Sequence, residues 1–165
     1  SMREKVRVAV AAFPNGHPRS QRVSQDIDAL VAKQVAGATF AITQLFFHAE
    51  DYLAFVEDAR GAGVSIPIVP GIMPVTSTAR LQRTLELTGE RLPVELFRAM
   101  ESAESPEAEF EVGVNHAIAL AGEVLRGGAP ALHLYTFNQH KAVLSVLDGV
   151  GLLSESPTPK ESETV

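Results

Sequence analysis

One amide side chain inside an apolar segment is the first candidate for chemistry. Gln44 lies in TFAITQLFF (39–47), and an amide carries a donor and an acceptor that are costly to bury unbonded. Its partner is either protein backbone or a ligand whose edge also presents a donor and an acceptor. Both interpretations of Gln44 stay open at this point.

An aromatic pair flanks a turn near the start of the chain. Phe13 and His17 enclose Pro14-Asn15-Gly16, where the imidazole could stack on a planar ligand or hydrogen-bond to it. The alternative for His17 is a structural role at the start of the next helix. Asp26 and Lys33 follow two helical turns apart, and by residue type alone they are typical of a solvated surface.

Two further segments combine rigid or aromatic residues with polar ones. In Pro70-Gly71-Ile72-Met73-Pro74 the prolines restrict the backbone, and Gly71 leaves room for a ligand or a neighbouring strand. A purely structural kink fits this pattern equally well. Tyr135-Thr136-Phe137-Asn138 places two rings at alternate positions before a polar residue, and at least one ring is expected in the core.

Composition excludes several other chemistries. The 165 residues contain no cysteine, which excludes disulfides and thiolate metal sites, and the five histidines lack metal-ligand spacing, so we predict no metal. A net charge of −6 disfavours nucleic acid as a partner. No apolar stretch approaches the ~18 residues of a membrane span and no signal segment opens the chain, so we expect a cytoplasmic protein without a membrane partner.

Alternating strand and helix patterns position these residues. Apolar runs typical of strands span 6–13, 39–47, 67–74 and 131–137, and the first is expected to be buried on both faces. Helical patterns span 20–37, 50–60 and 106–126, with shorter helices expected after Ser77, Pro93 and Asn138. Ser20, Ser77, Ser105 and Asn138 are candidate N-caps.

Four strands with helical crossovers predict a parallel sheet. Two architectures fit: an open doubly wound sheet, or four units of an eight-stranded βα barrel. In both, side chains just beyond the carboxyl ends of the strands converge on one mouth. All the candidate segments above lie at those ends, except Asp26 and Lys33, which lie on the first helix.

Taken together, five segments resemble methylenetetrahydrofolate reductases in order and spacing, over about residues 6–152. They are AAFPNGHP (11–18), Asp26 with Lys33, AGATFAITQLFF (36–47), IVPGIMPV (68–75) and LYTFN (134–138). The resemblance implies an α/β fold of the (βα) TIM-barrel type. Residues 1–153 would form four consecutive βα units corresponding to strands five to eight of the eight-stranded barrel, with the first four strands absent.

The resemblance also implies an activity, the NAD(P)H-dependent reduction of 5,10-methylenetetrahydrofolate to 5-methyltetrahydrofolate through FAD. It assigns cofactor contacts to Phe13, His17, Asp26 and Lys33, and folate contacts to Gln44, Gly71, Ile72, Met73, Tyr135 and Asn138. No catalytic residue is expected here, because the carboxylates that the family uses belong to the absent half. Ala29 and Ala32 stand where flavin-binding relatives often carry polar side chains, so a flavin-independent member is the alternative.

A half-barrel leaves open strand edges and an uncovered apolar face. We therefore expect a homodimer or association with the missing half. The competing interpretation is a non-catalytic half-barrel that binds a ligand or serves in assembly.

Residues 154–165 contain Ser, Pro, Thr, Glu and Lys without aromatic anchors, which predicts a disordered tail. Deleting them should leave the melting temperature almost unchanged, because no apolar surface is lost. A control truncation after Gln139, which also removes the last predicted helix, should lower it clearly. A comparable loss in both truncations would show that the tail docks on the domain.

Overall fold

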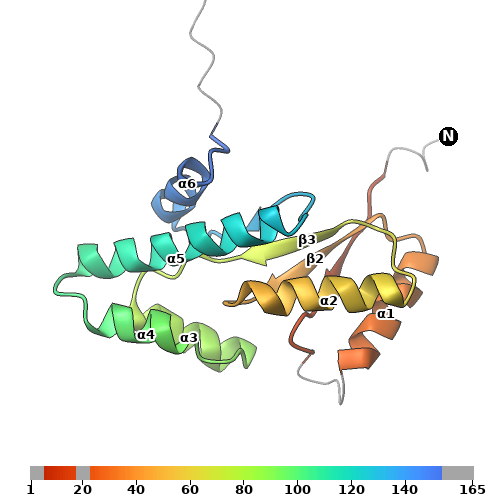
Figure 1. The fold of residues 1–165 in the computed structure, drawn as a ribbon, viewed down its shortest axis with the longest axis horizontal. Helices are drawn as coiled ribbons and strands as arrows, with labels where there is room; N and C mark the ends of the chain where they lie inside the picture. The colour runs from red at the N-terminus through yellow and green to blue at the C-terminus, as the bar shows by residue number, and fades with distance from the viewer. Residues whose placement is uncertain (1–5, 18–22, 154–165) are drawn as a thin grey trace, which may run out of the picture.

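The computed structural model describes residues 6–17 and 23–153, drawn in Figure 1. In chain order the elements are β1 (Ala9–Ala12), α1 (Val23–Val35), β2 (Phe40–Leu45), α2 (Ala49–Gly61), β3 (Ile68–Ile72), α3 (Thr78–Thr88), α4 (Val94–Glu101), α5 (Pro106–Arg126), β4 (His133–Leu134) and α6 (His140–Gly149). The alternation of strands and helices that the sequence predicts is confirmed. Residues 154–165 and the predicted cap Ser20 lie outside the described residues.

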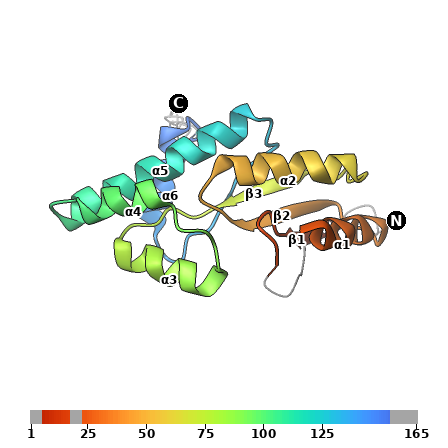
Figure 2. The ribbon, with the colours of Figure 1, turned by 60° about the horizontal axis from the view of Figure 1, so that its bottom comes forward.

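The four strands form one parallel sheet in the order β1-β2-β3-β4. Successive crossover helices are neighbours, with α1 against α2, α2 against α5, and α5 against α6. In Figure 2, α2 and α5 lie along one side of the sheet and α3 lies away from them, beyond the carboxyl end of β3. A doubly wound sheet needs a reversal of strand order, and these strands contain none.

The main core lies between the sheet and the crossover helices. Leu30, Phe55, Ile68, Ile72 and Val124 are each at most 2% exposed there. Burying such side chains supplies the dominant favourable free energy of folding, roughly 25 cal/mol for each Å² of apolar surface removed from water. A second cluster forms where α3 and α4 cover the carboxyl ends of β2 and β3, around Leu45, Phe47, Val75, Leu81, Leu96 and Met100.

The prediction that the first strand is buried on both faces is wrong. Ala9 and Ala11 of β1 are exposed, and Val8 just before it is 45% exposed. β1 lies at the edge of the sheet, where no other strand of residues 6–17 and 23–153 pairs with its outer side. The sheet face turned away from the helices has no layer covering β1 within the described residues, so its apolar residues meet solvent there.

Helix starts follow the predicted caps in two cases. The Ser77 and Ser105 hydroxyls accept hydrogen bonds from the backbone N–H groups of Arg80 (3.2 Å) and Ala108 (3.1 Å). The predicted cap Asn138 is wrong, because α6 begins at His140 with Gln139 as its N-cap. Asn138 has a φ of +65°, in the left-handed region that asparagine tolerates better than most residues. The turn at 137–138 also ends the last strand earlier than the sequence predicts.

One glycine permits a close approach between α5 and the segment that follows β3. A Cβ on Gly113 would overlap the backbone carbonyl of Val75, in the segment that leaves β3. We expect Gly113→Ala to destabilise the protein by about 2–3 kcal/mol, since backbone on both sides must move. Gly122→Ala is the matched control in the same helix, because nothing lies within 4 Å of its added Cβ.

The control should be neutral or stabilising by up to ~1 kcal/mol, given the better helix propensity of alanine. Urea unfolding of both variants gives the comparison. Equal unfolding midpoints for Gly113→Ala and Gly122→Ala would contradict this packing of α5.

Candidate functional site

Side chains beyond the carboxyl ends of three strands enclose a cavity of about 380 Å³. Its wall combines the end of β2, the segment after β3, one face of α3 and the segment after β4. The lining residues are Gln44, Leu45, Met73, Pro74, Val75, Arg80, Arg83, Thr84, Leu87, Thr88, Tyr135, Thr136, Phe137 and Gln139. A mainly apolar cavity with a few polar groups is typical of a small-molecule site.

A break in the β2–β3 ladder shapes the floor of this cavity. The register shifts between Ile42 and Leu45, and the N–H of Gly71 donates to the Thr43 hydroxyl (2.8 Å). The Tyr135 hydroxyl donates to the Thr43 carbonyl (3.0 Å). Bulges of this kind redirect side chains at the end of a strand, and Gln44 follows directly.

Gly71 is explained by protein neighbours rather than by a ligand. A Cβ at this position would overlap the Thr43 carbonyl and lie 2.7 Å from Cε2 of Tyr135. The glycine therefore lets the Tyr135 ring cross β3 and reach Thr43. Of the three alternatives that the sequence leaves open, the structure shows the close approach of a neighbouring strand.

Gln44 and Met73 both line the cavity, as half-buried side chains. Within the described part of the chain, no protein group hydrogen-bonds to the Gln44 amide. Its donor and its acceptor thus remain available to a bound molecule. This is the polar pair that an apolar cavity needs to orient a flat heterocycle.

Three rings run along β4 and the segment after it. His133 and Tyr135 meet edge to face, with centroids 4.6 Å apart, and Phe137 stacks on Tyr135 at 6.3 Å. Burial raises the pKa of Tyr135, so its hydroxyl stays protonated and donates at neutral pH. Phe137 is 67% exposed at the cavity rim, with a φ of +39°. Its ring is open to a ligand in a way that a core aromatic is not.

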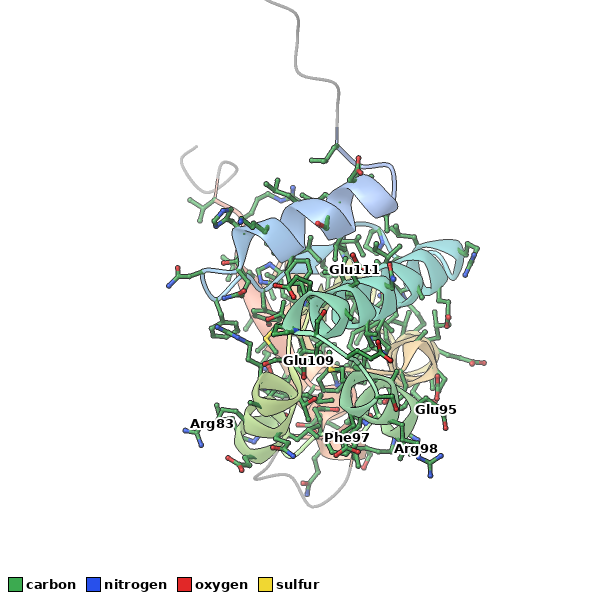
Figure 3. The ribbon with its side chains drawn as sticks, turned by 90° about the vertical axis from the view of Figure 1, so that its left-hand side faces the viewer. Arg83, Glu95, Phe97, Arg98, Glu109 and Glu111 are labelled. Carbon is green, nitrogen blue, oxygen red and sulfur yellow. The ribbon has the colours of Figure 1, made fainter. Side chains whose placement is uncertain are left out.

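Helix α3 forms a wall of the cavity, and none of its residues is among the predicted site residues. Arg80, Arg83, Thr84 and Leu87 follow one another at spacings of three, one and three, so they share a face toward the cavity. That spacing is visible in the sequence, but nothing there shows that α3 lies over the strand ends. In Figure 3 the Arg83 side chain projects from α3 toward solvent, which makes it a residue of the rim.

The start of α3 is tied to α5 by a carboxylate. Glu109 accepts hydrogen bonds from the backbone N–H of Thr78 and from its hydroxyl (2.5 Å for the hydroxyl). These two bonds lower the pKa of Glu109 and keep it ionised. An ionised side chain beside the first turn also complements the helix dipole.

The predicted cofactor residues gather around the end of β1. The rings of Phe13 and His17 meet edge to face at 4.6 Å, and both are half-buried. Asp26, only 9% exposed, accepts a hydrogen bond from the His17 N–H (3.0 Å). The Lys33 ammonium donates to the Ala11 carbonyl (2.8 Å). Asp26 and Lys33 thus bind the backbone of β1 and its turn, and Lys33 keeps two further donors.

Besides Gly71, two further predicted folate residues do not line the cavity. Ile72 is 0% exposed and packs in the helix-facing core, because alternate residues of β3 point to opposite faces. Its side chain has no surface for a ligand, and we drop it from the site. Asn138 is exposed in the left-handed turn, and the cavity is lined instead by its neighbours Phe137 and Gln139.

No group of three or more histidine, cysteine, aspartate or glutamate side chains in the described ranges has the arrangement of a metal site. No helix of residues 6–17 and 23–153 is long and apolar enough to cross a bilayer.

Comparison with known families decides what kind of protein carries this site. The family model described as methylenetetrahydrofolate reductase matches residues 1–151. The chain belongs to the methylenetetrahydrofolate reductase family. Members of this family use FAD and NAD(P)H. The resemblance noted in the sequence is thereby confirmed.

Curated reductases from distant organisms match most of the chain. A probable methylenetetrahydrofolate reductase (NADPH) of Caenorhabditis elegans is 35% identical over 147 residues, which are 88% of this chain and 22% of that protein. The 5,10-methylenetetrahydrofolate reductase of Escherichia coli K12 is 31% identical over 146 residues, 88% of this chain and 49% of the bacterial protein. The chain thus spans about half of this bacterial relative and about a fifth of the nematode one.

A solved structure shares the fold at low sequence identity. It is an uncharacterized protein from Clostridium thermocellum that binds two copies of 5-methyl-5,6,7,8-tetrahydrofolic acid. The TM-score is 0.64 at 16% identity, over 90% of this chain and 55% of that one. At this identity the likeness establishes the α/β fold of four parallel strands alternating with helices.

The Tyr135 hydroxyl provides a test of the cavity floor in this reductase-family chain. Tyr135→Phe leaves the partly buried Thr43 carbonyl without its donor, so we expect a loss of about 1–2 kcal/mol in unfolding free energy. Thr136→Ala, at an exposed neighbouring position, should stay within ~0.5 kcal/mol of the parent. Urea titrations of the two variants decide the matter, and a Tyr135→Phe midpoint equal to that of Thr136→Ala would count against the bond.

Proposed function

We propose that this chain is the second half of the barrel of a methylenetetrahydrofolate reductase, strands five to eight of eight. The sequential parallel order of the strands supports this, as does the succession of neighbouring helices on one side of the sheet. Coverage of about half of the bacterial reductases agrees with it. Four units leave two sheet edges, and an eight-stranded barrel closes by pairing them with four more strands.

The reaction proposed is the NAD(P)H-dependent reduction of 5,10-methylenetetrahydrofolate to 5-methyltetrahydrofolate. A bound FAD would supply the redox chemistry of this hydride transfer. Relatives specified for NADPH and for NADH match this chain to similar degrees. We therefore leave the nucleotide as NAD(P)H.

The cavity behind Gln44 is the proposed folate site, and the unbonded amide at its apolar wall is the observation that carries the proposal. The pterin ring presents adjacent donors and acceptors that a carboxamide matches with two hydrogen bonds. Met73, Tyr135 and Phe137 give its flat faces apolar and aromatic contact. These groups bind and orient the ring while excluding water from it.

For the flavin, the residues around β1 fit in part. Phe13 and His17 offer two rings at the end of the strand, where an isoalloxazine could pack. Asp26 and Lys33 act first on the protein, since each binds backbone near that strand end. We therefore propose that Asp26 holds the turn of His17. Lys33 would bind a phosphate of the flavin through the two N–H donors that its bond to Ala11 leaves unused. The flavin-independent alternative remains a proposal beside this one.

The proposed partners follow from what the chain lacks. No catalytic carboxylate is assigned to it, so the complementary half of the barrel must supply the proton-transfer groups. A second copy of the chain is the other candidate for covering the open face and the β1 edge. A non-catalytic folate-binding half-barrel is the competing function, favoured by that exposed face. The cytoplasmic location stays a prediction from the sequence.

Gln44→Ala in the full-length protein tests the proposal. Loss of two hydrogen bonds to a buried heterocycle should reduce kcat/KM for methylenetetrahydrofolate by about 10- to 100-fold, corresponding to ~1–3 kcal/mol. Gln82→Ala is the matched control, because Gln82 is an exposed amide on α3 that does not line the cavity. The assay is steady-state oxidation of NADH or NADPH by methylenetetrahydrofolate, with and without added FAD.

Unchanged kinetics in Gln44→Ala would remove Gln44 from the site. No oxidation of either dinucleotide by the full-length parent would refute the reductase function. If that protein still bound 5-methyltetrahydrofolate, the non-catalytic alternative would replace it.

A further inference from the structure

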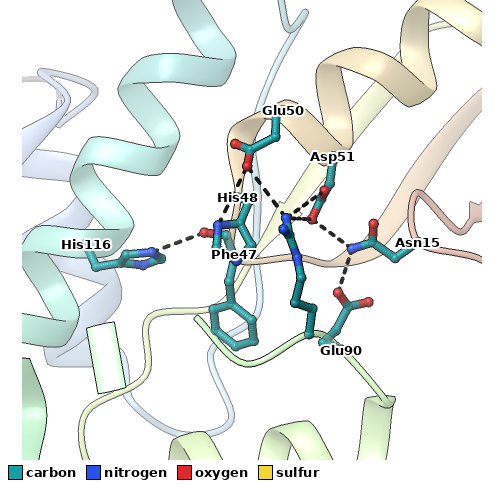
Figure 4. A network of polar contacts seen from close by, with 8 residues as sticks. Asn15, Phe47, His48, Glu50, Asp51, Glu90 and His116 are labelled. Carbon is teal, nitrogen blue, oxygen red and sulfur yellow. Dashed lines mark hydrogen bonds and ion pairs between the residues drawn. The ribbon is translucent and has the colours of Figure 1, made fainter. Parts of the chain in front are cut away.

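A polar network joins three segments that lie far apart in the sequence (Figure 4). The Asn15 amide, after β1, donates to Asp51 in the first turn of α2 (3.1 Å) and to Glu90 between α3 and α4 (2.6 Å). Arg91 donates to the other oxygen of Asp51 (3.2 Å) and lies 3.6 Å from a Glu50 oxygen. One amide thus bridges a carboxylate of α2 and a carboxylate of the segment between α3 and α4.

Stability alone does not account for this arrangement. Glu90 is half-buried, and burial raises its pKa, with Asp51 adding repulsion that the Asn15 hydrogen bond and Arg91 oppose. The Arg91 side chain is 59% exposed, and ion pairs at such positions contribute little to folding free energy. Placing two carboxylates beside one amide therefore costs free energy through their mutual repulsion. A role other than stability must favour the arrangement.

The position of the network suggests that benefit. Asn15 lies between Phe13 and His17, the two rings at the end of β1. Glu90 comes two residues after Thr88, which lines the cavity from α3. Asn15 thus connects the turn after β1, on the proposed cofactor side, with the end of α3, on the proposed folate side.

We propose that Asn15 is a positioning residue that couples the β1 turn to the wall of the cavity formed by α3. Occupation of the cavity fixes α3, and the Asn15–Glu90 bond transmits that order to the turn holding Phe13 and His17. A folate bound in the cavity thereby orders the turn that carries the proposed flavin contacts Phe13 and His17. The inference rests on the proposed function only for the identity of the ligand that fills the cavity.

Two backbone amides in the turn report on this coupling. The Gly16 N–H donates to the Phe13 carbonyl (3.1 Å), and the His17 N–H donates to Asp26 (3.0 Å). Both bonds must break before the amides exchange with solvent, so their exchange rates measure opening of the turn. The measurement uses full-length protein freed of flavin, because direct contact between a flavin and a folate would otherwise carry the signal.

Saturating 5-methyltetrahydrofolate should slow exchange at Gly16 and His17 by about fivefold or more in the parent protein. Asn15→Asp places a third carboxylate beside Asp51 and Glu90 at nearly unchanged shape, and should abolish this protection. The double change Asn15→Asp with Glu90→Gln returns the centre to two carboxylates and one amide, and should restore it. Glu86→Gln, which removes a charge from α3 away from the network, should behave as the parent.

The outcomes separate the two proposals. If 5-methyltetrahydrofolate binds the parent without slowing exchange in the turn, the coupling is refuted while the folate site stands. Full protection in Asn15→Asp, or none in the double variant, would also refute it. If the parent protein failed to bind 5-methyltetrahydrofolate both with and without flavin, the proposed function would instead be refuted.

Discussion

The contact at Thr43 between β2, β3 and the segment that follows β4 is the constraint on which the site depends. The Thr43 hydroxyl takes the N–H of Gly71, and its carbonyl takes the Tyr135 hydroxyl. Since the β2 ladder is interrupted there, Gln44 lies at the cavity and not in a regular pair with β3. Glycine at position 71 is required because the ring of Tyr135 passes where a Cβ would lie.

The contact at Thr43 shapes the cavity, and the proposed function depends on that cavity. Parallel strands in sequential order bring their carboxyl ends together, and the bulge opens one polar group at the point where they meet. Helix α3 then forms a wall of the cavity outside the sheet, and Glu109 of α5 holds the start of α3 through Thr78. The face that these helices leave open at β1 is the surface where the rest of the barrel is proposed to join.

Much of this could be predicted from the sequence, because local patterns determine it. The strand and helix alternation follows from apolar periodicity, and the caps Ser77 and Ser105 follow from side-chain chemistry. Gln44 is recognisable as a polar exception in an apolar run. Each of these predictions depends only on residues that are close together in the sequence.

What could not be predicted depends on contacts between distant segments. Asp26 and Lys33 look like surface charges or ligand contacts, but they bind the backbone of β1. Ile72 lies in the segment 70–74 among other predicted site residues. Because side chains alternate between the two faces of β3, that of Ile72 points into the core. Burial of the first strand on both faces was predicted from the apolar run 6–13 and its flanking turn, which do not show that β1 is an edge strand.

The most direct test of the account is a crystal structure of the full-length protein with 5-methyltetrahydrofolate bound. We expect the pterin edge within hydrogen-bonding distance of the Gln44 amide, with its faces against Tyr135 and Phe137 and its tail passing α3. An eight-stranded barrel should close on β1 and β4. A folate bound elsewhere, with the cavity behind Gln44 filled by protein or solvent, would contradict the central claim.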